Sequence, residues 1–373
     1  MSETGSHDYV FTSESVTEGH PDKVCDLIAD SILDAHIEAD PRARVACEVL
    51  CKEGQVVLAG EITSAAEIDA VKIARGVIRS IGYVDPDEPF SADRVTVHNF
   101  LGTQSPDIAV GVNSETSLSH EQGAGDQGLM FGYATDETPE LMPLPILLAH
   151  KLARAIADDR HSGKVAWLRP DAKTQVSVLY SNGRPVEVKT VLVSTQHRAH
   201  AEHATITAYV AEELVPRVLD GWNHPGIEIL VNPTGSFVLG GPSADAGVTG
   251  RKIIVDTYGG FARHGGGAFS GKDPSKVDRS GAYFCRSVAR QVVKAGIAHR
   301  AEVQVSYAIG RAQPTSVMVE TFGTGDSKAA ADLVLTKDFR PARIIADLNL
   351  LRPIYRQTTN YGHFGKAGLP WEV

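Results

Sequence analysis

The chain has 373 residues, of which 42% are hydrophobic and 22% charged, so it is long enough for two or three domains and too apolar to be disordered. Its net charge of −10 excludes a general nucleic-acid or anionic-membrane binder, because both need a basic face. The 35 glycines predict many tight turns or close approaches of the backbone to a ligand.

The cysteines and the absence of an export signal predict a cytoplasmic protein. Cys25, Cys47, Cys51 and Cys285 form no CxxC pair and fit neither a zinc pattern nor a disulfide framework. The first ten residues lack a basic and an apolar export segment, and the most apolar run, 141–149, is too short to cross a bilayer. We therefore expect no membrane role.

The first elements in the chain are a helix, a hairpin, a second helix and a strand. Residues 21–39 carry apolar side chains at helical spacing, and residues 43–63 alternate on either side of a Glu53-Gly54 turn. Residues 64–83 predict the second helix and residues 93–100 the strand.

This order recurs twice. The second copy covers 141–159, 174–195 with an Asn182-Gly183 turn, 201–219 and 226–233, and the third covers 274–296, 301–322 and 326–348. Amphipathic sheets and helices must bury their apolar faces on one another. We therefore predict an α+β fold of three pseudo-symmetric repeats, each a small antiparallel sheet backed by helices.

The repeats and their connections give the predicted boundaries. The N-terminal repeat covers 8–108, the central repeat 121–240 and the C-terminal repeat 241–373. The segment 102–125 between the first two is polar, rich in Gly and Ser, and long for a connection, so it is a candidate lid loop. A connection without a function is the alternative.

The loop before the first helix carries a candidate anion site. In His20-Pro21-Asp22 the proline fits the first helical position and Asp22 suits the first turn. A helix N-terminus attracts phosphate, His20 can donate a hydrogen bond to it, and Asp22 can hold a divalent cation. The alternative is a helix cap without a ligand.

Two phosphate-binding motifs are matched incompletely. Residues 266–272 satisfy GxxxxGK, but Asp273 stands where a P-loop needs Ser or Thr, so we reject a P-loop. Asp273 is interpreted instead as an N-cap, with Pro274 as the first helical residue. Residues 123–128 satisfy GxGxxG but lead into no helix, so we reject a dinucleotide fingerprint.

Basic residues from three segments form a predicted cationic cluster. One follows Asp171, two stand at the start of a predicted strand over 252–258, and two flank the third glycine-rich loop. They are Lys173, Arg251, Lys252, Lys272 and Lys276. Such a cluster suits a triphosphate, with Asp278 as a second metal carboxylate. Solvated surface charge is the alternative for the two loop lysines.

The first hairpin places two carboxylates on one face. Its turn pairs Ala46 with Glu61 and Glu48 with Ala59, so Glu48 and Glu61 are diagonal neighbours roughly 7–8 Å apart. They suggest a site for an ammonium group or a cation, and a solvated face is the alternative. The hairpin cysteines take the opposite, apolar face and are predicted core residues.

Seven dispersed segments match the motifs of one enzyme family. They are HPDK at 20–23, GEIT at 60–63, QSPDI at 104–108, GAGDQGLMFGYAT at 123–135, WLRPDAK at 167–173, GRKIIVDTYGG at 250–260 and HGGGAFSGKDPSKVDRS at 264–280. On these motifs the chain resembles the S-adenosylmethionine synthetases (methionine adenosyltransferases). The resemblance implies that the methionine sulfur attacks C5′ of ATP and displaces triphosphate, which is hydrolysed to pyrophosphate and phosphate.

The resemblance also implies a role for each matching residue. The catalytic residues would be His20, Lys173, Arg251 and Lys272. ATP would also contact Asp171, Ser236, Phe237, Asp245, Lys252 and Ala268. Methionine would contact Glu61, Gln104, Asp126, Asp245 and Lys276. Two Mg²⁺ per site would bind Asp22 and Asp278, and one K⁺ per subunit would bind Glu48. The family implies a homodimer with active sites at its interface, commonly paired into tetramers.

One residue departs from the family pattern. The motif GRF usually has Arg in the middle, whereas this chain has Ser236, which predicts weaker ATP binding. Two other functions remain as alternatives: another Mg²⁺-dependent ATP-using enzyme, such as a kinase or ligase, and a non-catalytic regulatory paralogue.

Overall fold

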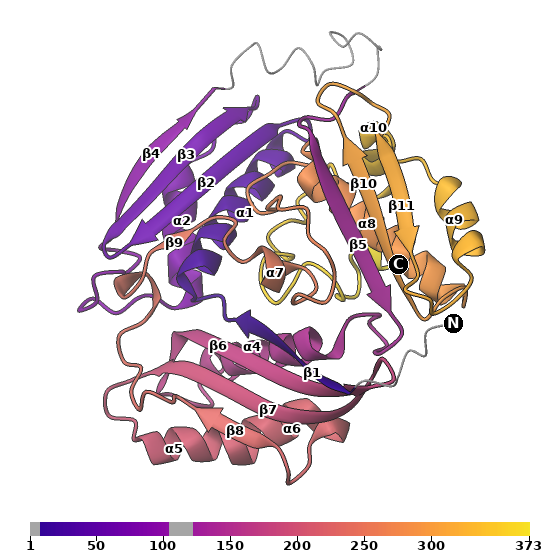
Figure 1. The fold of residues 1–373 in the computed structure, drawn as a ribbon. Helices are drawn as coiled ribbons and strands as arrows, with labels where there is room; N and C mark the ends of the chain where they lie inside the picture. Colours follow the sequence, from indigo (N-terminus) through magenta and orange to yellow (C-terminus); the bar gives the residue numbers. More distant parts are fainter. Residues whose placement is uncertain (1–7, 104–121) are drawn as a thin grey trace.

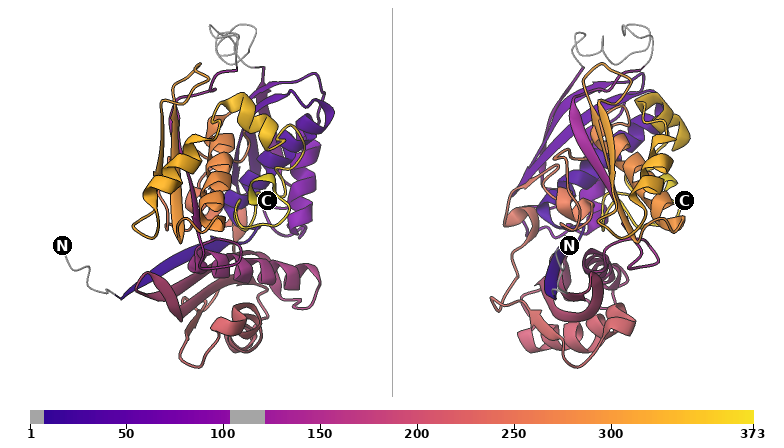
Figure 2. Two further views of the ribbon diagram at one scale, coloured as in Figure 1. Left: turned by 90° about the vertical axis from the view of Figure 1, so that its right-hand side faces the viewer. Right: turned by 45° about the vertical axis from the view of Figure 1, so that its right-hand side comes forward.

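The computed structural model describes residues 8–103 and 122–373, which form three small sheets and the helices packed on them (Figure 1). The strand orders are β1-β6-β7-β8, β4-β3-β2-β9 and β11-β10-β5. The sheet β1-β6-β7-β8 and its helices form a layer below the other two sheets (Figure 2). Within the described ranges, no helix is long and apolar enough to cross a membrane. The predicted α+β class is confirmed.

The strands follow the alternating segments of the sequence. They are β1 (Tyr9–Val16), β2 (Arg44–Lys52), β3 (Gln55–Thr63), β4 (Thr96–Gly102), β5 (Gly128–Thr135), β6 (Leu168–Ser181), β7 (Arg184–His197), β8 (Glu228–Val231), β9 (Gly247–Val248), β10 (Arg300–Tyr307) and β11 (Ser316–Glu320). The predicted turns are present, with Glu53 and Asn182 both at positive φ.

The helices follow the segments of helical periodicity. They are α1 (Pro21–Ala39), α2 (Ala70–Ile81), α4 (Leu144–His161), α5 (His203–Ala208), α6 (Val215–Leu219), α7 (Ile253–Asp256), α8 (Val277–Lys294), α9 (Ser327–Leu335) and α10 (Pro341–Asp347). A π-helical segment, Tyr209–Leu214, joins α5 to α6, and short 3₁₀ turns cover Asp220–Trp222, Gly241–Ser243 and Pro370–Glu372.

The hairpin of β2 and β3 has the predicted register, with Ala46 opposite Glu61 and Glu48 opposite Ala59. Its apolar face packs on α1, and all four cysteines of the chain are buried and unpaired, which confirms that they are core residues. On the other face Glu48 and Glu61 are exposed.

The strands of the three sheets are interleaved along the chain. Strand β1 pairs with β6 of the central unit, β5 pairs with β10 of the last unit, and the short β9 pairs with β2 of the first. Strands β4 and β8 pair in parallel with β3 and β7, so two of the sheets are mixed, whereas the sequence predicted antiparallel sheets. Residue patterns show where strands lie, but the pairing of distant strands depends on how the units pack.

Two hydrophobic cores serve the three sheets. One continuous core contains residues from α1, α2 and α8 and from both upper sheets, including Ile28, Ile78 and Val288. The other lies between the sheet β1-β6-β7-β8 and the helices α4, α5 and α6, and it includes Leu152 and Val176. The first and last units therefore share one core, which fixes the loops between them.

One predicted element is wrong. Residues 252–258 were expected to form a strand, but they contain the short helix α7. The buried Asp256 of this helix pairs with Lys23 of α1, and a short continuous apolar run does not distinguish a buried strand from a buried helical turn.

Candidate functional site

The edge of β2 that faces away from β3 brings together the segments that carry the predicted site. Its Cys47 N–H donates to the Gly271 carbonyl (3.0 Å), and its Val49 exchanges hydrogen bonds with Thr249. Cys47 and Val49 are two residues apart, which is about 7 Å along a strand. The basic residues that follow Thr249 and Gly271 in the chain therefore start from neighbouring positions on one strand edge.

His20 caps the N-terminus of α1, a role that the sequence offered only as the alternative to an anion site. Its Nδ1 accepts the N–H of Asp22 (3.1 Å), so the neutral ring carries its proton on Nε2. Burial, and then the Lys252 ammonium, lower the pKa of His20 to about 3, and Lys173 acts in the same direction. At neutral pH His20 is therefore an uncharged hydrogen-bond donor next to basic residues.

Asp22 joins the helix N-terminus to the basic segment. Its carboxylate accepts the Val248 N–H (3.0 Å) and contacts the Lys252 ammonium (2.5 Å), and Arg251 lies 3.9 Å from it. Burial opposes ionisation, but the hydrogen bonds from Lys252 and Val248 hold the pKa of Asp22 below its usual value. His20, Asp22 and these two basic residues therefore form one group.

Four aspartates recur at every fourth position of α1, and each accepts a main-chain N–H from the last third of the chain. The pairs are Asp22 with Val248, Asp26 with Gly250, Asp30 with Gly271, and Asp34 with both Tyr355 and Arg356. Residues four apart share one helix face, so this row of carboxylates aligns the loops of the site along α1. The spacing is visible in the sequence, but the prediction used only its first member.

A buried lysine compensates one of these charges together with that of a carboxylate in α7. Lys23 contacts Asp26 (3.0 Å) and Asp256 of α7 (2.7 Å), and all three side chains are buried. Burial favours the neutral amine, but the two carboxylates outweigh it and raise the pKa of Lys23. This ion pair fixes α7, and with it the preceding Arg251 and Lys252, against α1.

The third glycine-rich loop brings its two predicted ligands together. The Lys272 ammonium lies 2.7 Å from the Asp278 carboxylate. The predicted N-cap role of Asp273 is wrong, because α8 begins at Val277 and Lys276 is its N-cap residue. Asp273 is buried and accepts the N–H of Val45 and the ammonium of Lys276, so it ties this loop to β2.

Two buried polar residues of β7 position the loop that carries Phe237, and the sequence did not indicate them. The His197 Nε2 accepts the Phe237 N–H (3.0 Å), and the Gln196 amide donates to the Val238 carbonyl (3.0 Å). Gln196 also accepts the N–H of Asp171, whose carboxylate accepts the Gly241 N–H. The sequence feature that could have indicated them is a polar Gln-His pair at the end of an apolar strand.

Burial raises the pKa of Asp171 to about 6, and one of its carboxylate oxygens has no partner among the described residues. Ser236, which precedes Phe237, is exposed. An unsatisfied buried acceptor is suited to a ligand that donates a hydrogen bond.

The remaining predicted residues lie around this edge of β2. Ala268 packs against Gly250, which precedes Arg251, and Lys173 and Asp245 are exposed. Asp126 is exposed next to Gly125, which packs against the main chain of Ser275. Gln104 and most of the predicted lid, 102–125, lie outside the described residues. Glu61 is on the open face of the hairpin and, within the described residues, its side chain makes no hydrogen bond or ion pair with the other groups.

The carboxylates fit metals that are held mainly by a substrate. Among residues 8–103 and 122–373, no group of three or more His, Cys, Asp or Glu side chains forms a preformed metal site. Asp22 and Asp278 each present one carboxylate that a lysine neutralises. Mg²⁺ is commonly bound by one or two carboxylates together with substrate phosphates, so these residues fit it when a polyphosphate is present.

The fold and the site define an α+β protein of three related units, with basic residues and carboxylates arranged for a polyphosphate. Models of the S-adenosylmethionine synthetase N-terminal, central and C-terminal domains match residues 8–106, 121–237 and 239–373. The S-adenosylmethionine synthases of Sorangium cellulosum and Akkermansia muciniphila are 56% and 55% identical to the chain over 98% of its length, covering 87% and 95% of those proteins. The chain belongs to the S-adenosylmethionine synthetase family.

Proposed function

We propose that this chain, a methionine adenosyltransferase that makes S-adenosylmethionine, acts by in-line attack of the methionine sulfur on C5′ of ATP, with triphosphate as the leaving group. The triphosphate is then hydrolysed to pyrophosphate and phosphate. A thioether has no proton to remove, so the first step needs positioning and stabilisation of the leaving group rather than a general base.

The observation that carries this mechanism is the neutral His20 at the N-terminus of α1. Its Nε2–H donates to the oxygen on which negative charge develops as the C5′–O bond breaks, and Lys173, Arg251 and Lys272 bind the triphosphate. Because the Asp22 N–H occupies Nδ1, the neutral ring carries its proton on Nε2 and donates it from there.

Covalent catalysis by cysteine is not part of the proposal. All four thiols are buried, and burial raises the pKa of Cys47 to about 12. A nucleophilic cysteine needs a lowered pKa and access to the substrate.

The metals of the proposal are Mg²⁺ and K⁺. Asp22 and Asp278 would hold Mg²⁺, which supplies positive charge that offsets the triphosphate, and Glu48 would hold K⁺. Two ion pairs support this assignment: Lys252 contacts Asp22, and Lys272 contacts Asp278. A bound phosphate chain would pair with the two lysines, and each carboxylate would then be available to bind a cation.

The substrates occupy neighbouring parts of the same region. Phe237 would stack on the adenine, Asp171 would accept a hydrogen bond from the nucleoside, and Ser236, Lys252 and Ala268 would line the ATP site. The methionine side would be formed by Glu61, Gln104, Asp126, Asp245 and Lys276. The aspartate row of α1 and the Gln196-His197 pair support this arrangement by fixing the loops that carry these groups.

We also propose a homodimer with the site at its interface, paired into tetramers, in the cytoplasm. The open face of the sheet β4-β3-β2-β9 exposes Phe100 (67%) and Leu50 (40%) beside Glu48 and Glu61. An exposed apolar sheet face next to two carboxylates supports burial against a second copy. The four unpaired cysteines support a reducing compartment.

To test the proposal, the protein is incubated with ATP and methionine, with and without Mg²⁺ and K⁺, and every phosphorus-containing product is identified by ³¹P NMR. The proposal expects pyrophosphate, phosphate and the sulfonium product, and formation of ADP or AMP contradicts it. His20→Asn should abolish turnover while sparing ATP binding, and Lys328→Ala on the remote helix α9 is the control. The kinase, ligase and regulatory-paralogue alternatives are not favoured by the family comparisons.

A further inference from the structure

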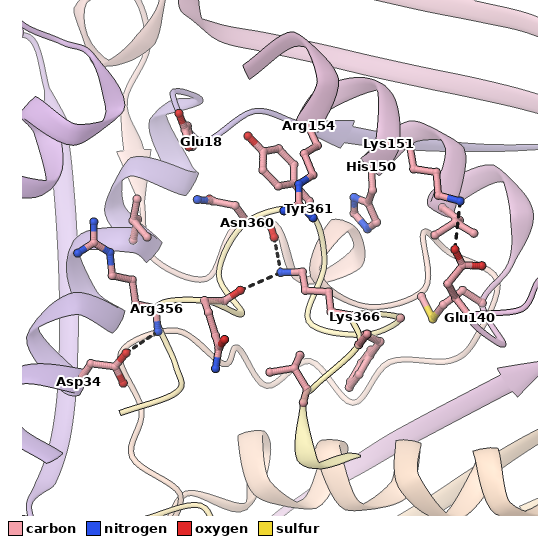
Figure 3. Close-up of a pocket in the computed structure, with 18 of the residues that line it drawn as sticks. Glu18, Asp34, Glu140, His150, Lys151, Arg154, Arg356, Asn360, Tyr361 and Lys366 are labelled. Atoms are coloured by element: carbon pink, nitrogen blue, oxygen red, sulfur yellow. Dashed lines mark hydrogen bonds and ion pairs between the residues drawn. The ribbon is translucent and has the colours of Figure 1, made fainter. Parts of the chain in front are cut away.

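A large cavity lies between α1, α4 and the C-terminal segment 353–369 (Figure 3). Its volume is about 1070 Å³, which is at the upper end of the range for small-molecule sites. None of the predicted ATP, methionine or metal residues lines it. The cavity is therefore a separate feature from the candidate active site.

The carboxylates of the cavity have their own partners. Glu18 contacts Arg160 (2.6 Å), and Glu140 contacts Lys151 (3.1 Å). Asp34 accepts the main-chain N–H of Tyr355 (3.0 Å) and that of the residue that follows it (2.8 Å). The charges of Glu18 and Glu140 are thus compensated by cations before any ligand is present, whereas Asp34 is engaged only by hydrogen bonds.

Two arginines of the cavity lack such compensation. Arg154 of α4 makes no hydrogen bond or ion pair within the part of the chain that the structure describes. The Arg356 guanidinium makes one long contact, 3.5 Å to the Ser80 hydroxyl, and no carboxylate contact among the same residues. Both side chains are exposed, and Figure 3 shows them on two walls of the cavity. Two guanidinium groups are therefore free to bind a ligand.

A third cation lies deeper in the wall. The Lys366 ammonium donates to the main-chain carbonyls of Gln357 (3.1 Å), Thr358 (3.0 Å) and Asn360 (2.5 Å), which uses all three of its donors. Burial, and then Lys23 and Arg154, lower its pKa to about 7. Lys366 is therefore only partly charged near pH 7, and it contributes through its field rather than by a hydrogen bond.

We infer that this cavity is a second ligand site, which binds a small multivalent oxyanion through Arg154 and Arg356, with Lys366 adding to the positive field. Planar guanidinium groups bind phosphate and carboxylate oxygens in bidentate fashion, so both chemistries fit. Glu18 and Glu140 do not oppose such an anion, because Arg160 and Lys151 balance their charges. The site does not depend on the proposed mechanism, since it shares no residue with it.

The experiment measures binding of pyrophosphate and of citrate by isothermal titration calorimetry in EDTA, using the full-length protein. Wild-type protein is compared with the double variant Arg154→Ala/Arg356→Ala and with Lys328→Ala, which removes one positive charge from an exposed helix far from the cavity. Loss of two charge-assisted contacts should weaken binding of the cavity ligand at least tenfold in the double variant only.

The double variant should fold normally because both arginines are exposed, and its thermal midpoint and its turnover of ATP and methionine serve as checks. Weakening with pyrophosphate alone identifies a phosphate site, and weakening with citrate alone identifies a carboxylate site. Isotherms that are the same for wild type, control and double variant with both anions overturn the inference. The candidate active site is intact in all three proteins, so anion binding there cannot produce the difference.

Discussion

The buried ion pair between Asp30 and Arg279 is the contact whose removal should damage the protein most. Arg279 donates two hydrogen bonds to Asp30 (2.7 and 3.1 Å), and both side chains are fully buried. Asp30 also accepts the Gly271 N–H (2.9 Å) and the Thr359 hydroxyl (2.8 Å). In Asp30→Ala the guanidinium remains buried without its counter-charge.

Removing one partner of a buried ion pair costs about 3–5 kcal/mol of unfolding free energy. We expect a loss of that size for Asp30→Ala, measured by urea unfolding followed by both tryptophan fluorescence and circular dichroism. Turnover should also fall, because Gly271 precedes Lys272 and loses its anchor on α1. Asp30→Asn keeps the size of the side chain and one of its two acceptor oxygens, so it should lose less.

The matched control is Lys328→Ala, which breaks an exposed ion pair with Asp332 and should leave the unfolding midpoint unchanged. If Asp30→Ala is as stable as this control, the argument that α1 holds the site loops through its aspartates is wrong. If stability falls but the Michaelis constants and kcat do not change in the folded protein, only the link to the site fails.

Three further changes test other parts of the structure. Ser236→Arg should lower the KM for ATP about tenfold without changing stability, because the position is exposed, and an unchanged KM contradicts the proposed nucleotide contact. Gly271→Ala should destabilise the protein and reduce kcat, because its φ is +81° and the added Cβ would lie 2.0 Å from the Cys47 carbonyl oxygen; wild-type unfolding and kcat would refute this. His150 is buried, and burial lowers its pKa to about 3, below an unfolded value of ~6.5. The folded state therefore resists its protonation, so the stability lost in His150→Gln at pH 7 should shrink by about 2 kcal/mol at pH 5; an equal loss at both pH values contradicts the burial argument.

Local patterns predicted most of the elements correctly. The helix over 21–39 and the hairpin around Glu53 follow from side-chain periodicity and turn residues, which depend only on neighbours in the chain. Residues 252–258 show the limit, since this run has strand-like composition but forms the helix α7 where Asp256 pairs with Lys23. The N-cap prediction for Asp273 failed for the same reason: its carboxylate is engaged by β2.

Some residues of the candidate site could likewise be predicted from the sequence, and others could not. Motifs indicated His20, Asp22, Lys272 and Asp278, and the structure brings these into two groups along one strand edge. Gln196 and His197 were missed, because their role is to hold a loop that lies 40 residues further along the chain. Residues that position others carry a weak sequence signal, since their effect depends on a partner that only folding supplies.

The sequence by itself determined the α+β class, the threefold recurrence of elements, and the residue types suited to a polyphosphate. Each follows from short-range periodicity or from chemistry that a side chain carries in any context. Only the tertiary structure decided which sheet each of β1, β5 and β9 joins, and that the last third of the chain is fastened to the aspartates of α1. Those contacts join residues more than 150 positions apart, so they depend on the packing of whole units around a shared core.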